Sequence, residues 1–360
     1  MVLVGVMAVK LRFAYTHFKM KRLMSGPSML ADMPSVSVCI PARNETHAMT
    51  DCLERVIAST YPKLEIIVLD DSSGDDTSVL IKSFAHAGVR FVEGSALPEG
   101  WLGKNHALEG LLHEASGTYI LYMDVDTHIK PDTIEQLVAY TLQENASMIS
   151  VLPRREDGWR ASTLFGSLRY YIELLFHTAA DPAVASSAWM IHRETLKRTI
   201  GGFDGLKSAI QPEAKLAAYF TAQHAYRFLI GTPMLGVAYE KKWSSQIETS
   251  IRLLYPVLGS QPIKALVAAG ILTLLSAPFF AVIFALITGL TTLGLLAGVA
   301  LLACMLLYGS FLMHVWNRSW WLGMLLWPYI VVQELVLVLV SMYRYLRGTA
   351  TWKGRLVRTK

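Results

Sequence analysis

Two acidic side chains, one residue apart, follow a short apolar stretch near the middle of this chain. The stretch Thr118–Thr127, TYILYMDVDT, is rich in β-branched and aromatic residues and predicts a buried strand ending in Asp124 and Asp126. If the strand geometry continues that far, both carboxylates point to the same face. Their repulsion would be relieved by a hard divalent cation, which could also bind substrate phosphates. A polar loop after an ordinary strand is the simpler alternative.

The surrounding region alternates predicted strands with predicted helices. The strands are predicted at residues 36–40, 65–70, 90–92 and 119–123, and the helices at 47–59, 75–87, 104–114 and 131–143. The strands show little polar alternation, which is typical of a parallel sheet covered by helices on both faces. The sequence therefore predicts an α/β fold with a mostly parallel sheet.

Polar clusters fall where three of these strands end. They are Arg43–Glu45, Asp70–Asp75 and Asp124–Asp126. Ligands of such sheets bind beyond the carboxyl ends of the strands, so we expect these clusters to meet at one site. The glycine fingerprint of dinucleotide oxidoreductases and the lysine motif of P-loop enzymes are both absent.

The C-terminal third of the chain is apolar enough to predict a membrane region. The 49 residues from Ala265 to Met313 contain no Asp, Glu, Lys or Arg, which is enough for two crossings. A further apolar run, Ser319–Tyr343, contains only Glu334 as a charged residue and is interrupted by Pro328. We predict a membrane region at residues 251–343 with two or three hydrophobic helices.

Basic residues flank the apolar segments, and this pattern explains the net charge of +5. Residues 1–34 begin with an apolar run too short to span a bilayer and predict an interfacial helix or a truncated membrane anchor. Residues 344–360 form a basic tail that is predicted to be cytoplasmic. The charge pattern favours lipid over nucleic acid as a partner, and no nucleic-acid-binding motif is present.

The expected location is the cell membrane, with several crossings and the globular domain in the cytoplasm. Two crossings between Ala265 and Met313 return the chain to the side on which it entered. A third full crossing would place the basic tail opposite the globular domain, against the positive-inside tendency. A re-entrant or interfacial segment broken at Pro328 avoids this conflict.

Four ordered motifs give the chain a family resemblance. They are Val36–Glu45 (VSVCIPARNE), Val68–Asp75 (VLDDSSGD), Gly100–Leu108 (GWLGKNHAL) and Met123–Asp126 (MDVD). The chain resembles glycosyltransferase family two, and within it the membrane-bound members associated with carotenoid and hopanoid glycosylation. The resemblance implies a GT-A domain at residues 35–250, a nucleotide-sugar donor that is UDP-linked, and Mg²⁺ or Mn²⁺.

The resemblance also implies roles for individual residues. Glu45 and Asp71 correspond to acidic residues beside the nucleoside, although Glu45 could instead cap the following helix. Lys104 corresponds to a lysine that neutralises phosphate charge. Asp126, together with Asp124, corresponds to the metal ligands. A solvated lysine at a helix start is the alternative for Lys104.

The resemblance places a catalytic base after the glycine turn Gly201–Asp204. The family has a Glu-Asp pair there, whereas this chain has Pro212 and Glu213. Glu213 remains a carboxylate, one methylene longer than Asp, and is predicted to be the base, with Asp204 in reserve. The alternative for Glu213 is an acidic residue at a helix start, which the preceding proline favours. Tyr239–Trp243 lacks the motif of chain-extending members, so transfer of a single sugar is expected.

The sequence therefore predicts a metal-dependent, inverting glycosyltransferase that moves one sugar to the hydroxyl of a membrane lipid. Inversion is implied only by the resemblance. Two alternatives stay open. The acceptor could be a polyisoprenyl phosphate, whose phosphate needs little help from a base, or the chain could be a membrane scaffold that has kept the fold without the chemistry.

Overall fold

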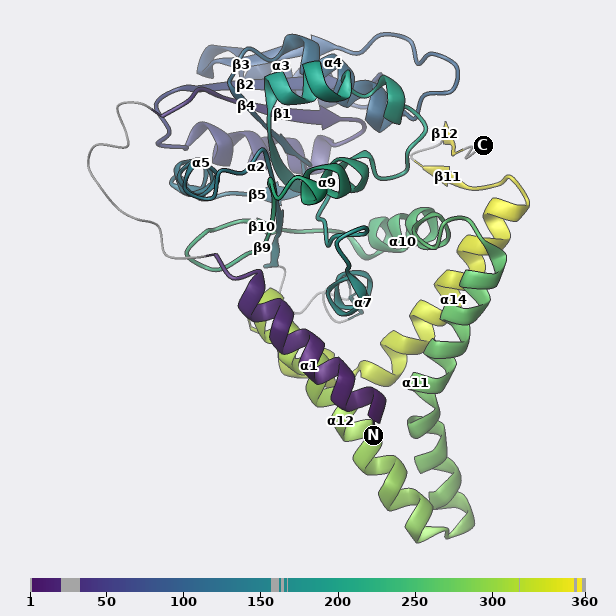
Figure 1. The fold of residues 1–360 in the computed structure, drawn as a ribbon. Coiled ribbons are helices and arrows are strands. Elements are labelled where there is room, and N and C mark those ends of the chain that lie inside the picture. The colour runs from purple at the N-terminus through teal and green to yellow at the C-terminus, as the bar shows by residue number, and fades with distance from the viewer. Residues whose placement is uncertain are drawn as a thin grey trace. The chain divides into compact units, whose positions relative to one another are not determined.

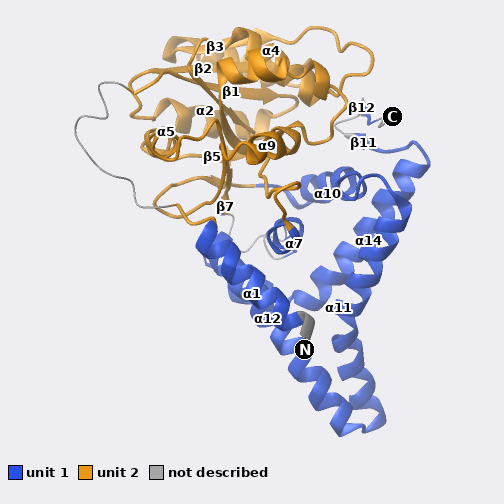
Figure 2. Ribbon diagram, viewed as in Figure 1, with its two compact units in different colours: residues 1–17, 155–176, 241–358 blue, residues 18–154, 177–240, 359–360 orange. Residues whose placement is uncertain are grey.

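The computed structural model describes residues 2–20, 33–156, 162, 165–166, 168–316, 318–352 and 355–357 (Figure 1). The chain divides into two compact units (Figure 2). Unit 1 contains residues 1–17, 155–176 and 241–358, and unit 2 contains residues 18–154 and 177–240. The sequence assigned residues 155–176 and 241–250 to the globular domain, whereas the structure groups them with the apolar helices.

Unit 2 is built on a seven-stranded sheet with the strand order β3-β2-β1-β4-β8-β6-β9. Its strands are β1 (Val36–Ala42), β2 (Leu64–Asp70), β3 (Val89–Glu93), β4 (Tyr119–Met123), β6 (Met148–Leu152), β8 (Ala188–His192) and β9 (Tyr226–Ile230). β3, β2, β1 and β4 are parallel, as are β6 and β9, and β8 runs antiparallel to both β4 and β6. The predicted mostly parallel α/β sheet is therefore confirmed.

Helices cover both faces of this sheet. They are α2 (Thr46–Ile57), α3 (Thr77–Ser83), α4 (Gly103–Glu114), α5 (Thr133–Gln143) and α9 (Pro212–Ala222). α2 and α5 lie on one side of β1 and β4, and α4 lies on the other (Figure 1). The apolar strand residues therefore face helices in both directions, which explains their lack of polar alternation.

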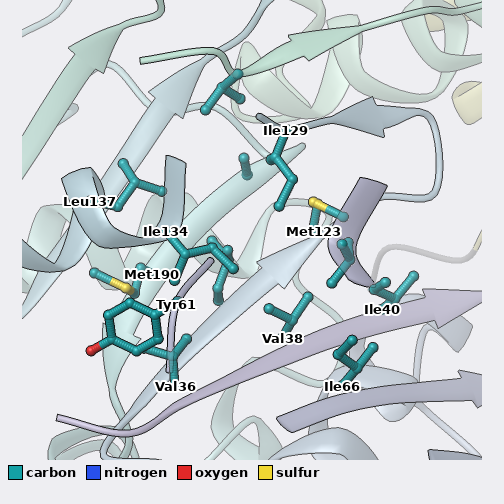
Figure 3. Close-up of a cluster of buried hydrophobic side chains, with 14 of the residues drawn as sticks. Val36, Val38, Ile40, Tyr61, Ile66, Met123, Ile129, Ile134, Leu137 and Met190 are labelled. Carbon is teal, nitrogen blue, oxygen red and sulfur yellow. The ribbon is translucent and has the colours of Figure 1, made fainter. Parts of the chain in front are cut away.

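The core between the sheet and its helices contains side chains from several strands and helices. Val36, Val38 and Ile40 of β1 point into it together with Ile134 and Leu137 of α5 (Figure 3). All five are at most 1% exposed. Burying such a side chain contributes about 1.5–3 kcal/mol, so this layer fixes the positions of the strands whose ends carry the polar clusters.

Glu65, on β2, accepts hydrogen bonds at the sheet edge opposite the polar clusters. Its carboxylate accepts from the hydroxyls of Ser37 and Ser116 and from the backbone amides of Ser116 and Gly117. Partial burial alone would raise the pKa of Glu65, but these hydrogen bonds outweigh it and lower the pKa below its usual value. The charged form of Glu65 therefore stabilises the fold.

We predict that Glu65→Gln lowers the thermal midpoint most at neutral pH. The carboxylate of Glu65 contributes stability above its unfolded pKa, and this contribution is lost as pH falls through the lower folded pKa. Replacing one charged hydrogen-bond acceptor should cost about 1 kcal/mol at pH 7. Melting curves of both proteins between pH 7 and pH 3.5 would check this, because the difference should shrink below about pH 4.5. A constant difference across that range would contradict the prediction.

Unit 1 consists mainly of helices. They are α1 (Val2–His17), α7 (Arg169–Phe176), α10 (Trp243–Val257), α11 (Pro262–Thr288), α12 (Thr291–Val315), α13 (Trp320–Leu325) and α14 (Trp327–Leu346). Within the described residues, α11, α12 and α14 are each long and apolar enough to cross a membrane. α11 and α12 are joined by a turn at Gly289, which has a positive φ of 75°. The two predicted long apolar helices are thus present.

The last apolar run forms two helices. α13 ends at Leu325, and Pro328 lies in the first turn of α14, where a proline needs no backbone hydrogen bond. Whether this run crosses fully stays a prediction. The apolar stretch Trp159–His177 predicts a helix that falls partly outside the described residues, and its described end is α7. Ser25–Pro27, whose composition predicts the start of a linker, also lies outside the described residues.

Candidate active site

The two acidic residues at the end of β4 lie in a tight turn. β4 ends at Met123, and the amide of Thr127 donates to the carbonyl of Asp124 at 3.0 Å. The strand predicted at residues 119–123 is therefore confirmed, and its geometry does not continue to Asp126, because this turn interrupts it. Val125 is buried, whereas Asp124 and Asp126 are both partly exposed. The turn thus keeps both carboxylates accessible while its central side chain packs inward.

A hydrogen bond between backbone groups holds the second acid of the turn. β5 (Thr127–His128) follows it directly and pairs with β10 (Ala238–Tyr239). Beyond this pair, the amide of Glu240 donates to the carbonyl of Asp126 at 3.0 Å. Two chain segments therefore fix the backbone that carries the Asp126 carboxylate.

Lys104 lies in the first turn of α4 and reaches the acidic turn. Its Nζ is 2.7 Å from Oδ1 of Asp124, and the side chains of Lys104 and Asp124 are 16% and 29% exposed. A partly buried ion pair is screened less by salt than a surface pair. The sequence predicted Lys104 as a phosphate-binding residue, and the structure places its ammonium beside a predicted metal ligand.

The loops after β1 and β2 bind each other through backbone and side-chain groups. Asn44 and Ser72 have positive φ angles of 52° and 54°. The Asn44 side chain accepts from the amide of Gly74 at 2.8 Å. Arg43 donates to the carbonyls of Asp71 and Ser72. The two loops therefore form one structured rim at the carboxyl ends of β1 and β2.

The acids in this rim have different environments. Asp70 accepts from the hydroxyls of Ser73 and Ser78, so its carboxylate holds the turn. Asp71 is buried, and its own amide donates to the carbonyl of Ala42 at 2.8 Å. Glu45 stands at the N-cap of α2 but makes no capping hydrogen bond with its side chain. The capping alternative for Glu45 is therefore not supported.

Asp75 stands just before α3, a position that predicts a helix-capping carboxylate, and its role in the structure is of this kind. Its carboxylate accepts hydrogen bonds from the hydroxyls and backbone amides of Thr46 and Thr77. Desolvation would raise the pKa of Asp75, but these bonds lower it to about 2. Asp75 therefore joins the start of α2 to the start of α3.

Glu213 lies in the first turn of α9, directly after Pro212 at the helix start. Its side chain is 2% exposed, which is rare for a lone acidic residue at a helix start. The hydroxyl of Ser186 donates to Oε1 of Glu213. This buried, hydrogen-bonded environment contrasts with that of Asp204, the reserve candidate, whose side chain is 74% exposed beside Lys207.

The segment before β8 connects Glu213 to the acidic turn. The carbonyl of Ser187 accepts from the amide of Asp124 and from the hydroxyl of Thr127, each at 3.0 Å. The adjacent Ser186 donates to Glu213. A single dipeptide thus contacts both the predicted metal-binding turn and the predicted base.

His128 is more buried than its position in the sequence suggests. A lone histidine just after Asp126 is expected to be a solvated loop residue, whereas His128 lies in β5, is 9% exposed and has Nε2 3.0 Å from Oδ2 of Asp51. Its pairing with α2 explains the burial. His106, for which a structural role is expected, lies edge-on to the Trp101 ring, with 5.6 Å between ring centroids.

Sequence reasoning missed several residues that position the site. Ser186 carries no sequence signal, because its partner Glu213 is 27 residues away. Asn105 and Glu109 of α4 bind the loop that leads to α9. These two residues are four apart, so their shared helix face could have been noted, although the pattern does not identify their partners.

Comparisons with known proteins agree with this architecture. The model of glycosyl transferase family 2 matches residues 37–199. A 4,4'-diaponeurosporenoate glycosyltransferase from Staphylococcus aureus (strain bovine RF122 / ET3-1) is 28% identical over 156 residues, which are 42% of this chain and 40% of that protein. The protein with this name from strain N315 is 32% identical over 123 residues, 33% of this chain and 32% of the relative. The match therefore spans well under half of these relatives.

One solved structure has a similar fold over nearly the whole chain. A mannosyltransferase from Pyrobaculum calidifontis, in complex with GDP-Man and Mn²⁺, superposes with a TM-score of 0.57 at 19% identity. The match covers 94% of this chain and 95% of the other. At that identity the likeness concerns the fold alone. The chain therefore has a GT-A fold, and its residues 37–199 are similar to glycosyl transferase family 2.

Proposed function

We propose that this protein is a metal-dependent, inverting glycosyltransferase that transfers one sugar from a nucleotide-sugar donor to the hydroxyl of a membrane lipid. One observation carries the proposal. The Ser186–Ser187 dipeptide contacts both the turn that holds Asp124 and the carboxylate of Glu213. A predicted phosphate and cation site and a predicted base therefore lie around the same short segment.

The residues at the acidic turn fit a divalent cation. Asp124 already lies beside the positive charge of Lys104, and Asp126 presents a second, partly exposed carboxylate. In the described part of the chain, no three His, Cys, Asp or Glu side chains converge to hold a metal ion. Mg²⁺ or Mn²⁺ would therefore depend on donor phosphates and water for its other ligands, as Mg²⁺ does in nucleotide sites. When bound, the cation would stabilise the charge of the leaving diphosphate.

The chain's own residues would supply the remaining chemistry. Lys104 would neutralise phosphate charge, while Glu45 and Asp71 would hold the nucleoside. Glu213 would accept the proton of the acceptor hydroxyl, whose oxygen attacks the anomeric carbon as the diphosphate leaves. Since Ser186 donates to Oε1, we assign the proton to Oε2 of Glu213.

A lipid acceptor is supported by the apolar helices of unit 1. α11, α12 and α14 would place the protein in the membrane where such an acceptor is dissolved. The similarity to diaponeurosporenoate glycosyltransferases, whose name includes a carotenoid acid, supports the same class of acceptor. We propose a cytoplasmic position for unit 2, because basic residues flank the apolar segments.

The proposal predicts metal-dependent labelling of a lipid. Membranes containing the protein would be incubated with radiolabelled UDP- and GDP-sugars, with Mn²⁺ or with EDTA, and the lipids extracted. We expect one donor to label a lipid in Mn²⁺, with at least about a hundredfold less label in EDTA. A labelled lipid that loses its sugar under mild acid would indicate a polyisoprenyl phosphate acceptor. If purified protein neither transfers sugar nor hydrolyses any donor, the scaffold alternative would replace the proposal.

A further inference from the structure

Asn105 is a buried polar residue of α4 that the proposed chemistry does not use. It is 1% exposed, and its side-chain amide donates to the carbonyls of Leu206, Lys207 and Ala209 at 2.8, 3.1 and 2.7 Å. An amide NH₂ has two protons, so at least one is shared between two carbonyls. All three acceptors lie in the loop that leads directly into α9 and Glu213.

α4 and the N-cap residue before it, Leu102, bind this loop at two further points. The amide of Leu102 donates to the carbonyl of Lys207 at 2.9 Å, and Oε2 of Glu109 accepts from the amide of Phe203 at 2.7 Å. Gly202 has a φ of +74°, and a Cβ there would lie 2.6 Å from Oε2 of Glu109. The glycine thus permits the close approach. One face of α4 therefore holds the loop over most of its length.

The buried ring of Phe203 attaches the start of this loop to the sheet. It lies edge-on to Tyr122 of β4, with 5.8 Å between ring centroids. The end of the loop continues through Gln211 into Pro212, the first residue of α9. Since both ends are fixed, the hydrogen bonds of Asn105 determine how the middle of the loop lies.

The first turn of α4 also contains Lys104, which pairs with Asp124. Consecutive residues of one helix therefore contact the predicted donor side and the loop before the predicted base. Beyond that base, Ser186 and Ser187 connect Glu213 back to the turn of Asp124. These contacts connect α4 to the loop, the loop to α9, and α9 through the acidic turn back to α4. A shift of the loop would therefore move Glu213 relative to Lys104.

We propose that Asn105 is a positioning residue that sets the place of Glu213 relative to the donor by holding the loop from Leu206 to Ala209 against α4. The inference rests on the proposed function, in which Glu213 is the base. It requires that loss of the amide donor slow transfer without weakening nucleotide binding. A displacement of about 1 Å in a reacting group can lower a rate about a hundredfold.

Asn105→Asp tests the inference, because it keeps the size of the side chain and replaces the NH₂ donor by an oxygen facing three carbonyls. We expect kcat for transfer to fall about 10- to 100-fold, while the Kd for UDP or GDP with Mn²⁺ changes less than twofold. Transfer would be measured with detergent-solubilised full-length protein and the donor that wild type uses. Nucleotide binding would be measured by calorimetry.

Leu111→Ala is the matched control. Leu111 is fully buried on the same helix, and its apolar side chain supplies none of the hydrogen bonds described above, so its truncation lowers stability without removing them. We expect its kcat per folded protein to stay within twofold of wild type. If Asn105→Asp loses kcat no more than Leu111→Ala, or loses nucleotide affinity in parallel, the positioning role is overturned.

Glu109→Gln provides a second variant if Asn105→Asp does not fold. It weakens the bond to Phe203 and should lower kcat about three- to tenfold with an unchanged nucleotide Kd. An unchanged kcat in a folded Glu109→Gln protein would overturn the inference. Glu213→Gln, assayed in parallel, separates a failure of the base assignment from a failure of the positioning role of Asn105. If it retains full activity the base assignment fails, whereas a wild-type kcat in Asn105→Asp beside an inactive Glu213→Gln removes only the role of Asn105.

Discussion

Sugar transfer by Asp126→Ala protein is expected to fall by at least about a thousandfold. The predicted cation would lose one of its two protein carboxylates, and stabilisation of a leaving diphosphate by such an ion amounts to several kcal/mol, where about 1.4 kcal/mol corresponds to tenfold in rate. Because Asp126 is partly exposed and lies in a turn held by backbone bonds, the fold should persist. Labelled-lipid assays would measure the loss of sugar transfer, and a thermal melt of the same preparation would measure whether the fold persists.

The control for Asp126→Ala is Glu54→Ala. Glu54 is an exposed acid on α2, so its replacement removes the same charge from unit 2 and should leave transfer within twofold of wild type. Wild-type transfer by Asp126→Ala, or by wild type in excess EDTA, would rule out the metal role. A loss of transfer with an equal loss of folded protein would assign Asp126 to stability instead.

The Glu213→Gln protein is expected to lose about 10²- to 10⁴-fold in kcat, which is the usual contribution of a general base. Glutamine matches glutamate in size and keeps an oxygen that can accept from Ser186, so the change removes basicity with little change in packing. The Kd for UDP or GDP with Mn²⁺ should stay within twofold. Steady-state transfer assays and calorimetry would measure the two quantities.

One companion variant, Glu213→Asp, helps to interpret the result of Glu213→Gln. Glu213→Asp keeps a carboxylate one methylene shorter and should retain more activity than Glu213→Gln, since a displaced base still accepts a proton. Glu213→Gln protein with nearly full activity would contradict the base assignment and favour a phosphate acceptor, whose nucleophile needs little deprotonation. Equal losses in the Gln and Asp variants would show that geometry dominates over basicity.

The strands of the first half of the domain were predictable from sequence. β1, β4 and most of β2 are short apolar runs, and burial on both faces leaves that signal uninterrupted. β3 lies at the sheet edge, where only Val89 is buried, and its alternation with a predicted helix made it recognisable. The start of β8 was less accessible to prediction. The small residues of the stretch Ala183–Ile191 predict a strand over its whole length, but residues 183–187 form a loop before β8 begins at Ala188, and residues 183–185 are buried in it. Small buried residues suit either conformation, so composition could not separate the two.

The candidate site was predictable one segment at a time but not as an assembly. Asp124, Asp126 and Lys104 each stand at the start or end of an element, where the sequence pattern is informative. Their mutual arrangement depends on tertiary contacts such as the pair of Lys104 with Asp124, 20 residues apart. The neighbourhood of Glu213 depends on Ser186, whose hydroxyl is common in any loop. Helix-start acids are ordinarily exposed, so burial of Glu213 could come only from the structure.

The most direct test of the account is to locate Mn²⁺ in a crystal of the protein grown with Mn²⁺ and the nucleoside diphosphate of its donor. We expect an anomalous manganese peak within coordination distance of Asp126 or Asp124, with the diphosphate between the metal and Lys104. Glu213 should face the side from which an acceptor would approach. A manganese peak away from both aspartates, or a diphosphate bound without contact to this turn, would contradict the account.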